Sequence, residues 1–440
     1  MPSTPPPSLD AFWMPFTPNR GFKKAPRILC SAKGHYYTDS SGRELLDGFS
    51  GLWTSGVGHC HPRIVAAVQE QVARLDYSMA FQMGHDNAFE LAEKVVALAP
   101  EGFTRVFFTN SGSEAVDTAL KIAIAYHGAR GQGQRTRLIG REKGYHGANI
   151  GGTSVGGIPP NRKAFSAVLM PGVDHIRHTH SLPDMAFSKG QPSWGAHLAE
   201  DFERVIQLHD GSNIAALIVE PASGSAGIIV PPIGYLQRLR ELCDKHGILL
   251  IFDEVITAFG RLGSAFGAER LGVTPDIITT AKGLTNGVIP MGAVLVKESI
   301  YQALANGPEN LIELFHGYTY SGHPVAAAAG LATFQVYEEE GTFAQARSIE
   351  GKFEELLHSL KGEPNVIDIR TIGLMGGVEL APRSGAIGAR GFEVFLKAFE
   401  DRLVIRNSGD ILQFAPMFKS SEAELERIVE TVRRALRKTE

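Results

Sequence analysis

Cysteine, long apolar runs and secretion signals are scarce or missing in this chain. Only three of its 440 residues are cysteines, and they stand far apart at Cys30, Cys60 and Cys243. A disulfide framework is therefore not expected, and a reducing cytoplasm is the expected location. No stretch approaches the roughly 20 apolar residues that a membrane-spanning helix needs. Residues 1–7, MPSTPPP, lack a basic patch and an apolar run, which favours a short flexible leader over a signal peptide.

Concentrated charge is also missing. The formal net charge is -4 and the basic residues are scattered, so neither nucleic acid nor an acidic membrane is expected as a partner. The His59-Cys60-His61 cluster has no second pair of ligands, and adjacent residues rarely converge on one ion, so we expect a structural turn and no metal. The stretch from Gly56 to His61 also resembles a dinucleotide-binding fingerprint, but it has His61 in place of the third glycine.

Short apolar runs, each followed by helical sequence, organise much of the chain. The runs lie at 105–109, 137–140, 215–219, 248–252 and 276–280. They do not alternate with polar residues, which is typical of parallel strands buried on both faces by helices. An amphipathic helix is predicted from about Ile64, with Pro62 just inside its start. The pattern predicts an α/β domain.

The chain is too long for one compact core, so two domains are expected. Late in the sequence, 344–360 and 422–437 are predicted to be helices, whereas 366–380 and 403–415 are predicted to be strands around glycine turns. These elements indicate a smaller α+β domain. The expected boundaries are 1–60 for an N-terminal segment that contributes to the small domain, 61–325 for the large domain, and 326–440 for the C-terminal small domain.

An aspartate and a lysine follow two of the apolar runs. Asp253 comes after the run at 248–252, and Lys282 comes after the run at 276–280. Pyridoxal phosphate needs such a pair, because a lysine amine holds its aldehyde as a Schiff base and an ionised carboxylate keeps its pyridine nitrogen protonated. Considered alone, Asp253 would ordinarily be interpreted as a helix-capping residue and Lys282 as a surface lysine.

Two further candidates also follow apolar runs, so we expect them on the same rim, the edge of the predicted sheet where the strands end. Glu220 follows the run at 215–219, and the loop from Ser111 to Ser113 follows the run at 105–109. Ligands of open α/β sheets bind outside the carboxyl ends of the strands. The convergence of these four candidates therefore favours a cofactor site over four unrelated loop residues.

The loop at 109–114, TNSGSE, opens a predicted helix and suits a phosphate group. Free backbone N–H groups and the positive helix end would bind the anion at Gly112 and Ser113, although an ordinary N-cap fits the same letters. In Tyr145-His146-Gly147, the tyrosine could stack on one face of a ring and Val255 could pack on the other. A tyrosine in a loop is more often half-buried packing.

A serine hydrolase is the alternative from another class of enzyme. Gly152-Thr153-Ser154-Val155-Gly156 fits the nucleophile-elbow pattern, which needs a strand before the serine and a helix after it. Because Pro159-Pro160 is expected to block that helix, the pattern argues against Ser154 as a nucleophile.

The stretch 249–292, LLIFDEVITAFGRLGSAFGAERLGVTPDIITTAKGLTNGVIPMG, closely resembles the class III aminotransferase signature, with Ala258 where glycine is commoner. The resemblance continues through LLDGFSGLWTSGVGHCHP, FFTNSGSEAVDTALKIA, GREKGYHGANIGGTSVGG, HGYTYSGHP and VIRNSGDILQFAPMF. It implies fold type I of the pyridoxal phosphate-dependent transferases. In that fold, helices cover a mostly parallel seven-stranded sheet, and a smaller α+β domain is attached.

The resemblance also implies roles for individual residues. Lys282 would be the Schiff-base lysine, and Asp253 would contact the pyridine nitrogen. Thr319 would reach the cofactor phosphate of a neighbouring subunit, which requires at least a homodimer. The expected cofactor-binding set is Ser111, Gly112, Ser113, Tyr145, His146, Glu220, Asp253, Val255, Lys282 and Thr319. The expected substrate-binding set is Trp53, Phe81, Tyr145, Arg406 and Gln413, in which Arg406 grips a carboxylate. Without the resemblance, Trp53 and Phe81 would be core aromatics and Arg406 a surface charge.

The implied reaction is the transfer of an amino group from an omega-amino acid such as beta-alanine, or from an amine, to pyruvate. The homodimer could assemble further into a tetramer. Open alternatives within the family are a broad amine:pyruvate transaminase, a 4-aminobutyrate or acetylornithine aminotransferase, and a decarboxylating relative.

Overall fold

A seven-stranded sheet forms the centre of the computed structural model, which describes residues 8–439; the leader expected at 1–7 lies outside this range. The spatial order is β4-β10-β9-β8-β7-β5-β6. All neighbours are parallel except β10, which pairs antiparallel with β4 and β9. The strands are β4 (Phe103–Thr109), β5 (Arg137–Arg141), β6 (Val173–Ile176), β7 (Ile214–Val219), β8 (Leu249–Asp253), β9 (Ile277–Thr280) and β10 (Gly292–Lys297).

Helices cover both faces of this sheet because its strands are apolar on both faces. Ile218 and Ile251 pack in one cluster with α5, whereas Leu217 and Leu250 pack in another with α10. The helices of this part are α3 (Pro62–Arg74), α4 (Asp86–Leu98), α5 (Gly112–Ala129), α6 (Ile150–Val155), α7 (Pro159–Lys163), α8 (Leu182–Met185), α9 (Glu200–His209), α10 (Tyr235–His246), α11 (Gly267–Leu271), α12 (Glu298–Leu304) and α13 (Pro324–Glu339). The predicted α/β architecture with a mostly parallel sheet is confirmed.

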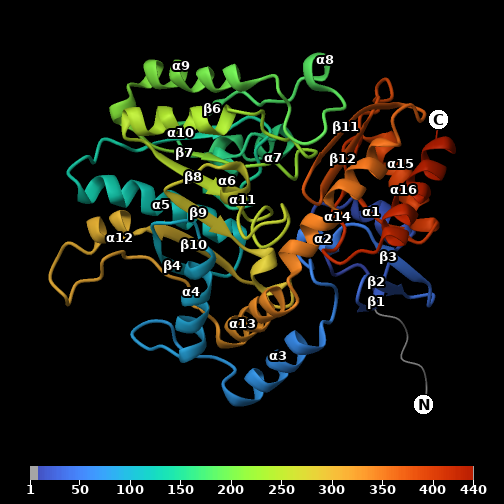
Figure 1. Ribbon diagram of the computed structural model, residues 1–440. Helices are drawn as coiled ribbons and strands as arrows, with labels where there is room; N and C mark the ends of the chain where they lie inside the picture. Colours follow the sequence, from blue (N-terminus) through green and yellow to red (C-terminus); the bar gives the residue numbers. More distant parts are fainter. Residues whose placement is uncertain (1–7, 440) are drawn as a thin grey trace.

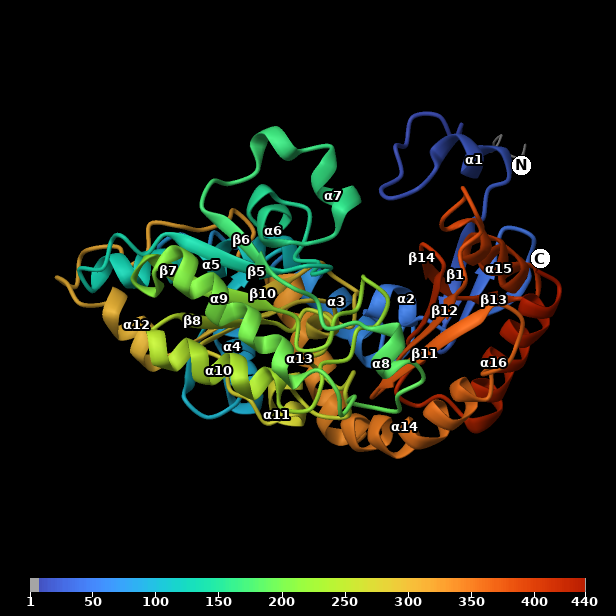
Figure 2. The same cartoon turned by 90° about the horizontal axis from the view of Figure 1, so that it is seen from above.

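Two four-stranded sheets lie to one side of the large sheet (Figures 1 and 2). One is antiparallel, with the order β11-β12-β15-β14, and the other has the order β1-β2-β3-β13. Their strands are β11 (Val366–Ile372), β12 (Met375–Leu380), β14 (Arg406–Ser408), β15 (Ile411–Phe414), β1 (Leu29–Lys33), β2 (Tyr36–Asp39), β3 (Glu44–Asp47) and β13 (Leu403–Val404). The nearby helices are α1 (Asn19–Lys24), α2 (Ser50–Trp53), α14 (Thr342–His358), α15 (Ala389–Glu400) and α16 (Glu422–Arg437).

The N-terminal strands belong with the C-terminal part of the chain. Strand β3 pairs in parallel with β13, so that Leu46 is opposite Leu403. This pairing agrees with an N-terminal segment that joins the small domain, whereas the boundaries at 60 and 325 stay a prediction.

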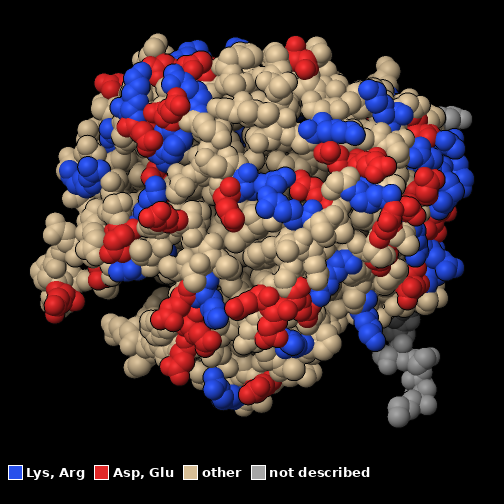
Figure 3. Space-filling view, viewed as in Figure 1, with Lys and Arg blue, Asp and Glu red and all other residues tan. Residues whose placement is uncertain are grey.

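The surface carries mixed charge. In the face of Figure 3, lysine and arginine side chains lie interspersed with aspartate and glutamate over both parts of the molecule. Among the described residues, no helix combines the length and the apolar character that a membrane crossing requires.

Candidate active site

A cavity of about 460 Å³ opens at the carboxyl ends of β5, β7, β8 and β9. It brings together ten of the residues proposed from the sequence: Trp53, Gly112, Ser113, Tyr145, His146, Glu220, Asp253, Val255, Lys282 and Arg406. This position is the one expected for a ligand site in an open α/β sheet. Such a volume is enough for a small organic cofactor.

Asp253 is held rigidly at the end of β8. Its Oδ2 lies 2.8 Å from Nδ1 of His146, and its Oδ1 accepts from the backbone N–H of Val255 at 3.1 Å and from the Thr279 hydroxyl at 3.3 Å. Asp253 is 6% exposed and His146 is 1% exposed. The carboxylate is thus fixed in one orientation at the cavity wall.

Lys282 brings the amine of a half-buried side chain to the same cavity. It begins a 3₁₀ turn, Lys282–Thr285, directly beyond β9 and has a positive φ of 48°. Burial lowers the pKa of Lys282 to about 8, although Asp253 and Glu220 act in the opposite direction. The amine is therefore far more often neutral near pH 8 than an exposed lysine, and a neutral amine is what a nucleophile requires.

Glu220 is a buried carboxylate between the loops that line the cavity. Its Oε1 accepts from the backbone N–H of Tyr145 at 3.0 Å, and its Oε2 accepts from that of Gly224 at 3.0 Å. Burial raises the pKa of Glu220 above its ordinary value. The first of these bonds fixes the backbone of Tyr145, which lines the cavity together with Val255.

The Ser-Gly-Ser loop at the start of α5 both caps the helix and lines the cavity. The Ser111 hydroxyl accepts from the N–H of Glu114 at 3.2 Å, so Ser111 is the N-cap. Gly112 and Ser113 line the cavity instead. A Cβ on Gly112 would lie only 2.9 Å from Cγ1 of Val255, so glycine lets the helix start approach the neighbouring loop closely.

Trp53 lies beside both cations of the cavity. Its ring centre is 5.7 Å from Nζ of Lys282 and 5.8 Å from Cζ of Arg406. Burial lowers the pKa of Arg406 below its ordinary value. The Trp53 Nε1 is buried without a hydrogen-bond partner among residues 8–439.

Four predicted site residues do not line this cavity. Ser111 caps α5, as described above. Phe81 is 54% exposed, and Thr319 is also exposed. Gln413 is fully buried behind the wall, where its Nε2 donates to the Gly224 carbonyl at 3.0 Å. Within one chain, Gln413 therefore contacts the loop at Gly224 and does not line the cavity.

Sequence reasoning missed the other lining residues: Phe16, Leu52, Gly147, Ile158, Pro160, Asn161, Ser225, Ile256, Ala281 and Ser408. One of them carried a usable signal. Ser408 stands two residues after Arg406 in strand β14, and alternate residues of a strand share a face.

The nucleophile-elbow pattern does not form a hydrolase site. Ser154 lies inside α6 rather than on a turn between strand and helix, and its hydroxyl donates to the Ile150 carbonyl at 2.7 Å. The expectation that Pro159 and Pro160 would block a helix was wrong, because α7 begins at Pro159. Proline is tolerated there, since the first helical N–H groups need no partner within the helix.

The two histidines of the His-Cys-His cluster each contact a different acidic residue. His59 lies 2.8 Å from an Asp47 oxygen, and His61 lies 3.2 Å from a Glu340 oxygen. The two side chains therefore do not converge on one point.

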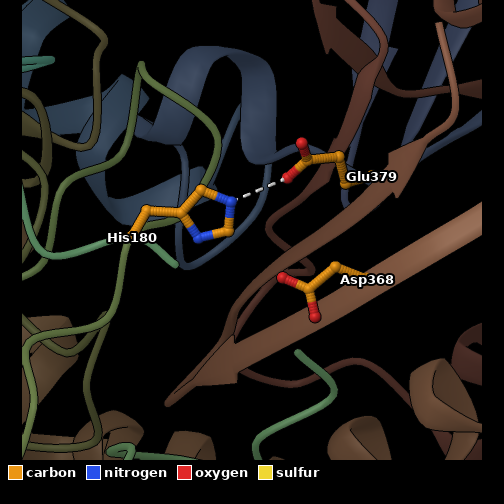
Figure 4. A group of neighbouring side chains, drawn as sticks. All are labelled: His180, Asp368 and Glu379. Atoms are coloured by element: carbon orange, nitrogen blue, oxygen red, sulfur yellow. Dashed lines mark ion pairs between the residues drawn. The ribbon is translucent and has the colours of Figure 1, made fainter. Parts of the chain in front are cut away.

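Another group of potential metal ligands is already occupied by an arginine. His180, Asp368 and Glu379 approach one another between the two parts of the chain (Figure 4). Arg370 forms ion pairs with both acids, and its Nη1 lies 3.4 Å from Nε2 of His180. The guanidinium pairs with both acids, so the cluster is a partly buried ion-pair network.

Comparisons with known proteins agree over almost the whole chain. A family model described as aminotransferase class-III matches residues 18–436. An omega-aminotransferase of Caulobacter vibrioides is 56% identical over 428 residues, which are 97% of this chain and 97% of that protein. A beta-alanine–pyruvate aminotransferase of Pseudomonas aeruginosa is 51% identical over 98% of this chain and 96% of that protein. Among solved structures, an omega transaminase of Pseudomonas jessenii in complex with PMP has a TM-score of 0.92 at 33% identity, covering 98% of this chain and 96% of that one.

These matches confirm the family resemblance inferred from the signature around Asp253 and Lys282. The chain belongs to the class III aminotransferase family and is a pyridoxal phosphate-dependent aminotransferase.

Proposed function

We propose that this enzyme transfers the amino group of an omega-amino acid such as beta-alanine, or of an amine, to pyruvate, giving a semialdehyde or ketone and L-alanine. The observation that carries the proposal is the cavity shared by the Lys282 amine, the fixed Asp253 carboxylate and Arg406. A relative named for beta-alanine and pyruvate, at 51% identity, and one named for omega-amino acids and pyruvate, at 49% identity, support the choice of substrates.

The residues present fit pyridoxal phosphate. The amine of Lys282 would hold the cofactor covalently, Asp253 would pair with its pyridine nitrogen, and the start of α5 at Gly112 and Ser113 would bind its phosphate. When bound, the cofactor supplies an electron sink for the carbon that loses a proton. Tyr145 and Val255 would enclose its ring from two sides.

Lys282 would then move the proton. Its neutral amine would take the proton from the amine-bearing carbon of the substrate and would donate that proton again later in the same half-reaction. The lowered pKa keeps the lysine amine available as a base near neutral pH. Its position inside the cavity avoids a second bimolecular step.

Arg406 would orient the substrates through their carboxylates. Its guanidinium is partly buried at the cavity wall beside Trp53, where a desolvated cation attracts a carboxylate strongly. Beta-alanine and pyruvate carry their carboxylates at different distances from the reacting carbon. Arg406 would therefore have to shift between the two half-reactions or be bypassed in one of them. Trp53 and Tyr145 would set the width of the pocket.

We further infer a cytoplasmic homodimer, which could pair into a tetramer. The exposed Thr319 would contact the cofactor phosphate of the neighbouring subunit, and the exposed Phe81 would reach a shared pocket. Mixing inactive Lys282→Ala subunits with Thr319→Ala subunits tests this arrangement. Activity should return in mixed dimers, because one of their two sites then combines an intact Lys282 with an intact Thr319. Activity no higher than the sum of the parents would argue against it.

The proposed reaction is tested with purified holoprotein. Its absorption spectrum should show the bound cofactor, and beta-alanine with pyruvate should give the highest turnover among matched donor and acceptor pairs. The panel includes 4-aminobutyrate, N-acetylornithine and simple amines as donors, and 2-oxoglutarate as the other acceptor. Preference for 2-oxoglutarate would overturn the proposed acceptor, and release of carbon dioxide would indicate a decarboxylating relative.

A further inference from the structure

A tyrosine on a helix that is distant in sequence binds the backbone next to Lys282. Tyr337, on α13, donates its hydroxyl to the carbonyl of Gly283 at 2.7 Å. Gly283 directly follows Lys282 in the 3₁₀ turn. The same carbonyl also accepts from the N–H of Asn286 at 3.2 Å.

The Lys282 backbone needs such support because its conformation is unfavourable for a residue with a side chain. Its φ of 48° lies in the left-handed region, which lysine seldom adopts. Conformations of this kind persist only where the surrounding structure enforces them, and they are concentrated at functional sites. Here the conformation sets the direction of the Cα–Cβ bond and thus of the amine.

Tyr337 is suited to hold this conformation. It is 4% exposed, and its ring lies 5.0 Å from that of Phe343 and 5.8 Å from that of Phe334, which leaves it little freedom. Burial raises the pKa of Tyr337, so the hydroxyl keeps its proton throughout the working range. The other side of the turn is fixed as well, because the N–H of Gly287 donates to the Lys282 carbonyl at 3.0 Å.

We propose that Tyr337 is a positioning residue for Lys282: its bond to the Gly283 carbonyl aims the lysine amine for proton transfer. The inference rests on the proposed function, since it assumes that Lys282 moves the proton. Tyr337 does not line the cavity. It therefore acts on the rate of the chemical step and not on substrate affinity.

The test is Tyr337→Phe, which removes one oxygen and keeps the ring packing. We expect bound cofactor, a KM within about twofold of the wild type and a kcat at least about tenfold lower, because small misplacements of a catalytic group are costly. The deuterium isotope effect on kcat, measured with a donor deuterated at its amine-bearing carbon, should be larger in Tyr337→Phe than in the wild type. Proton transfer by a misdirected lysine would then limit turnover.

The matched control is Thr333→Val on the same helix. Thr333 is fully buried, and its hydroxyl donates to the Ala329 carbonyl at 2.7 Å, within α13 and not to the lysine turn. The Thr333→Val variant should have a lower Tm but an unchanged kcat and an unchanged isotope effect. The inference is overturned if Tyr337→Phe also lowers Tm alone. Lys282→Ala separates the two claims: an active Lys282→Ala enzyme would refute the proposed function itself, whereas an inactive one beside an unimpaired Tyr337→Phe enzyme would refute only this inference.

Discussion

His146 contacts the Asp253 carboxylate, with 2.8 Å between Nδ1 of the histidine and Oδ2 of the aspartate. The pair joins the segment after β5 to the end of β8. Because Val255 and Thr279 bind the other carboxylate oxygen, Asp253 cannot rotate without losing a partner. This arrangement gives the proposed partner of the pyridine nitrogen a fixed direction and a buried position.

Asp253→Asn should bind the cofactor and lose most of the activity. The amide has nearly the shape of the carboxylate but no charge to stabilise a protonated pyridine nitrogen. We expect a fall in kcat of at least about 10²–10³-fold, the scale on which preorganised electrostatic groups act. The measurement is steady-state kinetics on protein whose cofactor content is determined by absorbance. An unchanged kcat in the loaded variant would exclude this role of Asp253.

His146→Asn should have a milder effect, because Asp253 keeps its charge and the bonds from Val255 and Thr279. We expect a loss of about tenfold in kcat, which corresponds to roughly 1.4 kcal/mol of transition-state stabilisation. In the double variant with Asp253→Asn, the losses should not add, because both substitutions disturb one interacting unit. Additive losses would show that the two residues act independently.

Uptake of pyridoxal phosphate by the cofactor-free protein should depend on pH through Lys282. Burial lowers the pKa of this amine from 10.5 to about 8, so its neutral fraction rises as the pH increases through about 8. At pH 8, about half of the amine is neutral, compared with roughly 0.3% for an exposed lysine. Stopped-flow absorbance should give an uptake rate that climbs between pH 7 and about 9 and then levels off. A midpoint near 10.5 would contradict the burial of Lys282.

Gly112→Ala should weaken cofactor binding, because its Cβ would lie 2.9 and 3.0 Å from the two methyl groups of Val255. Overpacking of this kind costs about 1–3 kcal/mol. Gly128→Ala, on the exposed end of the same helix, is the control, since a Cβ there has open space. Equilibrium titration should show weaker binding in the first variant only. Equal affinities would mean that Val255 adapts without cost.

Arg406→Ala should separate donors by their carboxylate. Beta-alanine and n-propylamine have the same carbon chain and differ in this group, so they form a matched pair of donors. We expect kcat/KM to fall by at least about tenfold for beta-alanine, since a desolvated charged hydrogen bond is worth about 1.5–3 kcal/mol, and to change little for n-propylamine. Equal losses for both donors would remove the proposed role of Arg406.

The regular elements of the fold were largely predictable. Helix α16 begins and ends where the sequence indicates, at Glu422 and Arg437, because Ser421 and Glu424 form a capping box ahead of an amphipathic stretch. Glu220, Asp253 and Lys282 lie at the carboxyl ends of strands that are buried along their whole length, as is typical of parallel strands covered by helices. Their order and burial then bring these three side chains to one rim.

Other features depend on tertiary contacts that no local pattern encodes. The antiparallel direction of β10, Gly292–Lys297, is set by how the chain returns to the sheet, since an apolar run reads alike in both directions. Phe16, Asn161 and Ser225 reach the cavity from loops whose paths follow from packing. The bond from Tyr337 to Gly283 spans 54 positions and likewise leaves no local trace in the sequence.

Chemical trapping of the bound cofactor tests directly whether Lys282 carries it. Purified holoprotein is reduced with borohydride and digested, and the peptides are analysed by mass spectrometry. We expect the pyridoxyl group on Lys282 and no such adduct in Lys282→Ala. A pyridoxyl group on a different lysine, or reduced holoprotein with an unmodified Lys282, would contradict it.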